Sequence, residues 1–211
     1  MTRSSIRFWT CVFLAAVTAG VGGCSSSQPS RFYLLHSTTG SVKSPDVLSP
    51  PSEISIGVGP VKLPDYLDRP QIVTRATPGK LDLAEFDRWA EPLSENFARV
   101  LAEELSAMLS TSRVLMHPWP RTSQVDCQIA VDVVRFEGVP GGRATLGARW
   151  TLYGEQGRKV LAQRNSEISD PVDSTSYEAL VAAQSRAVAS LSREIAAAVR
   201  EAVESKPGSR P

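Results

Sequence analysis

A short apolar run near the N-terminus limits how much of this chain can enter a folded domain. Arg3 and Arg7 precede the run with no acidic residue between them, and mostly apolar residues follow from Phe8 to Val21. About 14 apolar residues are too few for a comfortable transmembrane helix but typical of a secretory signal peptide. We therefore predict that residues 1–23 are a signal peptide, which leaves 188 of the 211 residues for the exported protein.

Cys24 ends this run in the sequence Val21-Gly22-Gly23-Cys24. The ending resembles a bacterial lipobox, which implies lipidation of Cys24, with palmitate among the acyl chains. Ser25, rather than Asp, after the cysteine then favours the outer membrane. Two or three acyl chains would make the attachment stable. Two other interpretations stay open: an ordinary signal peptide with an incidental cysteine, and an uncleaved anchor helix.

The segment after Cys24 is short and polar. Residues 24–30 form the predicted tether, and a strand begins at Arg31, seven residues after the cysteine. A fully extended tether of this length spans about 25 Å at most, so the domain must sit close to its membrane. We assign residues 31–204 to a single domain and residues 205–211 to a disordered tail.

Charge and cysteine content exclude several classes of protein. Loss of Arg3 and Arg7 lowers the basic count from 23 to 21 against 22 acidic residues. This balance gives no reason to expect binding to nucleic acid, which needs a clustered basic surface. Cys127 is the one cysteine beyond Cys24, so the mature chain forms no internal disulfide. Its apolar, strand-like surroundings predict a buried, inert thiol.

Hydrophobic periodicity predicts seven or eight strands and two helices. The strands are expected at 31–35, 54–58, 71–76, 80–83, 113–117, 126–137, 143–153 and 159–168, and the helices at 92–109 and 176–203. Thr175 and Glu178 fit a capping box for the second helix. The pattern predicts an α+β fold, with a mixed, mostly antiparallel sheet and two long amphipathic helices packed on one face.

No catalytic or metal-binding pattern stands out in the sequence. His36 and His117 occur in unrelated contexts, without the spacing that a metal site needs. No nucleophile elbow or phosphate-binding loop is present. We therefore predict no catalytic residue, no metal and no cofactor, and expect a protein of binding or assembly.

Two segments combine arginine, an aromatic residue and proline, residues 63–75 and 86–93. Arginine and aromatic residues are enriched at protein interfaces. The predicted interface residues are Leu67, Asp68, Arg69, Arg88 and Trp89. The alternative is a well-packed loop in which Trp89 secures the start of the first helix.

The same segments resemble the ABC-type transport auxiliary lipoproteins, also described as the PqiC/YmbA type. The resemblance rests on Cys24 followed by Phe32-Tyr33-Leu34-Leu35, on Ile56-Gly57-Val58-Gly59-Pro60-Val61, on the run from Leu63 to Val73, on Arg88-Trp89-Ala90-Glu91-Pro92-Leu93 and on Tyr177-Glu178-Ala179-Leu180-Val181. It implies a noncatalytic lipoprotein on the periplasmic face of the outer membrane. The implied partners are an MCE-type bridge protein and its ABC transporter, which move lipids or other hydrophobic molecules between membranes and so support membrane integrity. A homo-oligomeric ring that matches a ring-like bridge is a further expectation.

Two other functions remain open at this point. A lipoprotein regulator of a periplasmic cell-envelope enzyme would also be anchored and noncatalytic, but it would usually need a longer tether to cross the wall layer. A hydrolase with an unrecognised site is the third possibility.

Overall fold

The computed structural model describes residues 28–39, 53–120 and 122–205. The signal peptide and Cys24 therefore lie outside the described residues, as do residues 206–211 of the predicted tail. The elements, in chain order, are β1 (Arg31–Tyr33), β2 (Ile56–Lys62), β3 (Gln71–Thr77), β4 (Lys80–Trp89), α2 (Leu93–Met108), β5 (Val114–Met116), β6 (Cys127–Gly138), β7 (Arg143–Gly154), β8 (Lys159–Pro171) and α3 (Tyr177–Glu204). Among the described residues, no helix has the length and hydropathy that a membrane crossing requires.

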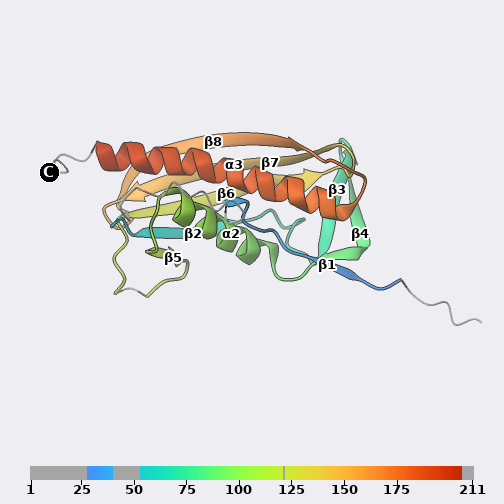
Figure 1. Cartoon of the computed structure of the whole chain (residues 1–211), viewed down its shortest axis with the longest axis horizontal. Helices are drawn as coiled ribbons and strands as arrows, with labels where there is room; N and C mark the ends of the chain where they lie inside the picture. The colour runs from blue at the N-terminus through green and yellow to red at the C-terminus, as the bar shows by residue number, and fades with distance from the viewer. Residues whose placement is uncertain (1–27, 40–52, 121, 206–211) are drawn as a thin grey trace, which may run out of the picture.

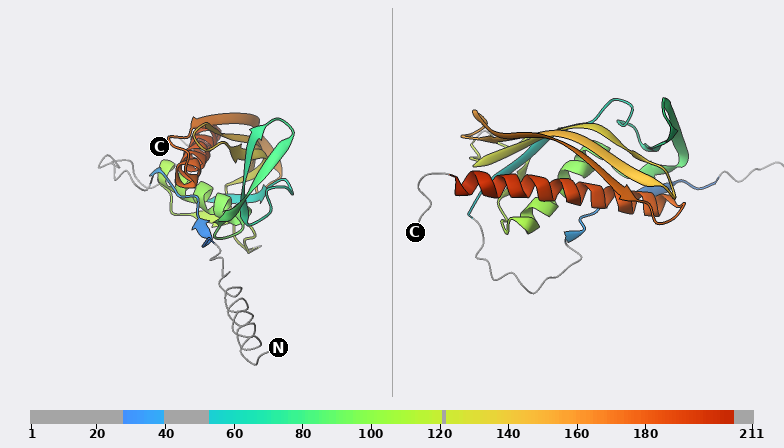
Figure 2. Two further views of the ribbon diagram at one scale, coloured as in Figure 1. Left: turned by 90° about the vertical axis from the view of Figure 1, so that its right-hand side faces the viewer. Right: turned by 90° about the horizontal axis from the view of Figure 1, so that it is seen from above.

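The strands form one curled sheet that divides at β6 (Figures 1 and 2). On one side, β6 pairs with β7, and β7 pairs with β8. On the other side, the first half of β6 pairs with β2, which continues to β5, while its last residue meets β3, which continues to β4 and β1. The sheet therefore has two separate branches beside one edge of β6.

The predicted α+β fold with a mostly antiparallel sheet is wrong, because the domain is a mixed α/β fold. Four strand pairings in the described part of the chain are parallel, namely β1–β4, β2–β5, β2–β6 and β3–β6, against three antiparallel ones. Alternating hydrophobicity shows that a strand is half-buried but not which way it runs. The long connections around β1, β2 and α2 provide the crossovers that parallel pairing needs.

Both helices pack inside the curl of the sheet and against each other (Figure 2). α3 packs on β6, β7 and β8, whereas α2 packs on β2 and β5. Small buried residues such as Ala183, Ala187 and Ala196 let the α3 backbone approach the sheet closely. The N-cap of α3 is Ser176, whose Oγ accepts from the Ala179 amide at 3.2 Å, so the capping box predicted at Thr175 is wrong by one residue.

The core is continuous from the sheet to both helices. Phe97 of α2 meets Phe136 of β6 edge to face, with ring centres 5.6 Å apart. Cys127 is buried at 5% exposure, which confirms the predicted burial of this residue.

Candidate docking surface and family

The loop of residues 63–70 fills the gap between the two branches of the sheet. β2 ends where Lys62 lies beside Asp132 of β6, and β3 returns to β6 where Thr74 meets Gly138. Leu67, from the middle of the loop, is 2% exposed and belongs to the core. The loop therefore closes the sheet between its branches and holds their spacing.

A β-bulge lies in β6 next to this loop. The register with β7 shifts between Val133 and Arg135, so that Val134 is the extra residue, and its side chain is exposed. A bulge redirects the side chains that follow it. Phe136 after the bulge turns into the core, while Glu137 comes to lie under the loop.

Glu137 is a buried carboxylate beneath the loop of residues 63–70, and its exposed fraction is 1%. The hydroxyl of Tyr66 donates to its Oε2 at 2.8 Å, and Arg135 Nε donates to its Oε1 at 3.2 Å. Arg75 Nε also donates to Oε1. A buried charge needs such compensation to be tolerated. Arg135 also lies 3.9 Å from Glu167 Oε1, so two arginines and two carboxylates form the cluster.

A surface pocket of about 630 Å³ opens over this cluster. Its lining residues are Tyr66, Arg75, Thr77, Pro78, Gly79, Val134, Arg135 and Glu137. The Arg75 guanidinium lies 6.0 Å from the centre of the Tyr66 ring, within cation–π range. The pocket is therefore lined by an aromatic ring and two arginines, a composition common where proteins dock.

The Tyr66 phenol gives this cluster a pH dependence. Burial, and then the hydrogen bond to Glu137, raise the pKa of Tyr66 from 10.0 to about 12. Because folding raises this pKa, the protonated phenol contributes its full stabilisation below pH 10. That contribution is lost as the pH rises toward 12. We expect Tyr66→Phe to remove part of the alkaline loss of stability. Urea unfolding of the wild-type protein and of Tyr66→Phe from pH 9 to 12 measures the free energy of unfolding that each protein loses. The difference between the two losses should match the size of the pKa shift. Parallel curves for the two proteins across this range would contradict the assignment.

The two segments predicted to form an interface are neighbours in the structure. The amide of Trp89 donates to the Pro70 carbonyl at 2.7 Å, and Gln71 pairs with Arg88. Trp89 is buried, like Leu67, so both side chains pack inside the domain. Asp68 is exposed, while Arg69 and Arg88 are partly exposed and within reach of a partner.

Arg69 has one atom that the fold does not satisfy. Its Nε is buried and has no hydrogen-bond partner among the residues that the structure describes. A buried donor left unpaired costs about 1–3 kcal/mol, so such groups are rare in folded proteins. Of the predicted interface residues, Arg69 is therefore the one with a buried polar atom that the described fold leaves unsatisfied.

Sequence reasoning missed Glu137 and Arg135. Strict alternation from Cys127 to Val133 would place both on the core-facing side of the strand, and only the bulge at Val134 changes the face on which they lie. The one available signal was the pair of Tyr66 and Arg75 in the segment of residues 63–75, whose partner the sequence does not reveal.

A second carboxylate fastens the first strand to the sheet. Asp87 of β4 is buried and accepts from Arg31 Nε at 2.7 Å and Nη2 at 2.9 Å. The hydroxyl of Tyr33 donates to it at 2.7 Å. Burial, and then this hydrogen bond, raise the pKa of Tyr33. Any pull transmitted through the tether therefore reaches the sheet through β1 and this ion pair.

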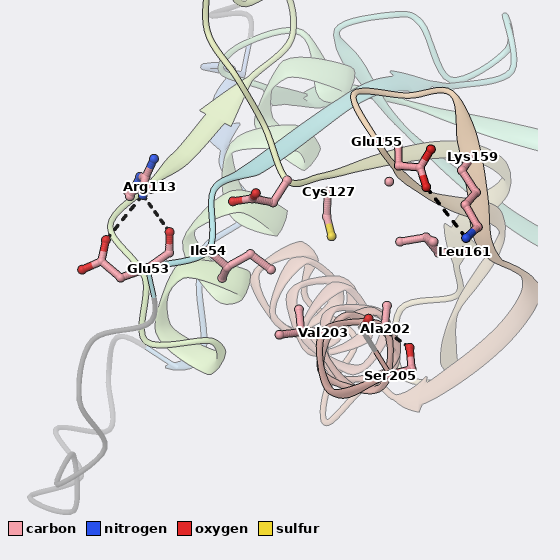
Figure 3. Close-up of a pocket in the computed structure, with 12 residues that line it drawn as sticks. Glu53, Ile54, Arg113, Cys127, Glu155, Lys159, Leu161, Ala202, Val203 and Ser205 are labelled. Atoms are coloured by element: carbon pink, nitrogen blue, oxygen red, sulfur yellow. Dashed lines mark hydrogen bonds and ion pairs between the residues drawn. The ribbon is translucent and has the colours of Figure 1, made fainter. Parts of the chain in front are cut away.

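Another pocket of about 630 Å³ opens at the other end of the domain, beside the last turn of α3 (Figure 3). Cys127 faces it from the start of β6, Ile54 from the segment before β2, and Val203 from α3 (Figure 3). Exposed ion pairs of 3.5 Å and 3.8 Å, Glu53–Arg113 and Glu155–Lys159, lie at its rim. In the described ranges, no three His, Cys, Asp or Glu side chains gather as a metal site would require. This pocket therefore has an apolar floor and a charged rim.

Comparison with known proteins agrees with this architecture. A crystal structure of an uncharacterized protein is 20% identical, with a TM-score of 0.65, and the match covers 82% of this chain and 99% of the other. Protein XCC0632 from Xanthomonas campestris, of the DUF330 family, is 20% identical, with a TM-score of 0.64 and coverage of 83% and 100%. At this identity the likeness shows the fold alone. No curated protein matches the chain.

The sequence itself matches one family model over most of its length. The matched residues, 33–196, extend from the first strand to the last turns of α3, and the family is described as the ABC-type transport auxiliary lipoprotein component. The resemblance found in the sequence is thereby confirmed, and with it a general auxiliary role beside an ABC transport system. The chain belongs to the ABC-type transport auxiliary lipoprotein family.

Proposed function

We propose that this protein is a noncatalytic docking component of an intermembrane transport system, held by lipidated Cys24 on the periplasmic face of the outer membrane. It connects an MCE-type bridge protein, driven by an inner-membrane ABC transporter, to that membrane. The cargo is a lipid or another hydrophobic molecule, and its transport supports membrane integrity.

The family match over residues 33–196 is the observation that carries this proposal. The distance along the chain supports it, because only six residues separate Cys24 from β1. A domain on so short a tether stays at the membrane surface, where a component that receives a bridge is needed.

The docking surface comprises Asp68, Arg69 and Arg88, with the pocket over Glu137 beside it. Arginines at the centre of an interface often dominate its binding energy. The unpaired Nε of Arg69 is buried before any partner binds, so much of its desolvation is already complete. The partner is either the bridge protein or a neighbouring copy in a ring around it.

A crosslinked pull-down of the lipidated protein from membranes, read by mass spectrometry, tests the proposal. Recovery of an MCE-type protein together with ABC-transporter subunits is the expected result. Recovery of a cell-wall synthase without any transporter component would contradict it and favour the alternative, a regulator of a periplasmic cell-envelope enzyme.

The docking residues are tested by the double variant Arg69→Ala/Arg88→Ala. If each arginine contributes about 2 kcal/mol, recovery of the partner falls more than tenfold. The matched control is Arg149→Ala/Arg158→Ala, which removes two exposed arginines from β7 and the turn after it. Equal recovery from both double variants, with both proteins folded, would exclude this surface as the docking site.

A further inference from the structure

Two large apolar side chains on β1 point into solvent. Phe32 is 65% exposed and Leu34, just after the strand, is 45% exposed. Their neighbours Tyr33 and Leu35 are buried, so the alternation of the strand places Phe32 and Leu34 together on the outer face. Exposure of a phenylalanine side chain to water is unfavourable, so contact of Phe32 with an apolar partner would be favourable.

Arg88 lies beside this apolar pair. Phe32 is in register with Arg88 on β4, and Arg88 is in register with Gln71 on β3, so the three side chains form a row across the outer face. The Nε of Arg88 donates to the carbonyl of Glu85 at 3.3 Å, and no ion pair holds its guanidinium in the described part of the chain. The row therefore combines an aromatic side chain with a cation that lacks a carboxylate.

The position of β1 in the chain limits what can cover this face. Arg31 opens the strand seven residues after Cys24, and an extended chain of that length spans about 25 Å. If Cys24 is acylated, β1 cannot move farther than this from the lipid surface. Contact between them is then intramolecular and needs little intrinsic affinity, because the tether keeps the local concentration high.

A second copy of the chain is a poorer fit for the same face. β1 has only three residues, so its free edge offers few ladder hydrogen bonds to an added strand. Phe32 and Leu34 alone are also a small apolar area for a stable dimer.

We propose that the outer face of β1 rests on the bilayer that holds Cys24, with Phe32 and Leu34 among the upper acyl carbons and Arg88 left free for the protein partner beside it. The inference rests on the lipid anchor of the proposed function. It goes beyond that function by giving the domain a fixed orientation on the membrane. Aromatic and aliphatic side chains such as Phe32 and Leu34 are well suited to the boundary between acyl chains and headgroups.

The test uses the full lipidated protein in vesicles of phosphatidylethanolamine and phosphatidylglycerol, with acyl chains brominated near the headgroup. Bromine quenches tryptophan emission only at short range. Phe32→Trp places the probe on β1, and Val160→Trp is the matched control, because Val160 is 54% exposed at the start of β8. The native tryptophans are common to both proteins.

The expected result is blue-shifted, bromine-quenched emission for Phe32→Trp, with neither effect for Val160→Trp. Equal, unquenched emission from both variants on vesicle-bound protein would overturn the inference. A blue shift without quenching would also overturn it, since it would indicate a protein partner such as a second copy. Protein that fails to float with the vesicles lacks the anchor, and the inference then falls together with the outer-membrane location. If only the docking function is wrong, Phe32→Trp is still quenched by the brominated lipid, but the pull-down recovers no transporter.

Discussion

Cys24→Ser should remove the protein from the outer membrane, because a serine hydroxyl cannot form the thioether that carries the lipid. The variant then either stays in the inner membrane through residues 1–23 or is released without acyl chains. Gradient separation of the two membranes, with mass spectrometry of the N-terminal peptide, measures both outcomes. Because multiple acyl chains give nearly irreversible attachment, we expect an almost complete loss from the outer membrane.

Cys11→Ser is the matched control for this change. It replaces a cysteine within the predicted signal peptide and leaves Cys24 in place, so localisation should be that of the unchanged protein. Wild-type protein in the outer membrane with an unmodified N-terminal peptide would contradict lipidation at Cys24, as would unchanged localisation of Cys24→Ser.

The largest loss of folding stability is expected from Phe97→Ala. Phe97 is fully buried on α2 and packs edge to face on Phe136 of β6. Its truncation leaves a cavity between helix and sheet and should lower the free energy of unfolding by about 3–5 kcal/mol. Domains of this size are stable by only about 5–15 kcal/mol, so the variant approaches the limit of folding.

Urea unfolding followed by far-ultraviolet circular dichroism measures this effect. Phe32→Ala is the matched control, because it truncates the same residue type at an exposed site and should change the free energy of unfolding by less than about 0.5 kcal/mol. Similar losses from the two variants would show that the contact of α2 with the sheet does not dominate the core.

The helices and most strands could be predicted from the sequence, because their periodicity is local. α2 was expected at 92–109 and is found at Leu93–Met108, and β7 and β8 also begin at the predicted residues. Strand direction was not accessible in the same way. The parallel pairing of β1 with β4 joins segments more than fifty residues apart, and nothing in either segment encodes that choice.

The candidate surface shows the same division between local and distant information. Arg69 and Arg88 were recognised by residue type in their own segments, and the structure brings those segments together. Trp89 and Leu67 have the same interface-like composition, yet they are buried, because burial depends on the fold around them. The role of Glu137 depends on Tyr66 and Arg75, which lie over sixty residues earlier in the chain.

α3 also has a consequence for how the protein is made and exported. The helix is the last element that the structure describes, and it contributes fourteen buried residues to the core. These residues pack on strands that are synthesised before the helix. Until α3 has been synthesised, the inner face of β7 and β8 lacks the helix that covers it in the described structure. The growing polypeptide therefore cannot close its core early. A chain that must thread through a narrow translocation channel benefits from such a delay, because the channel admits only unfolded polypeptide.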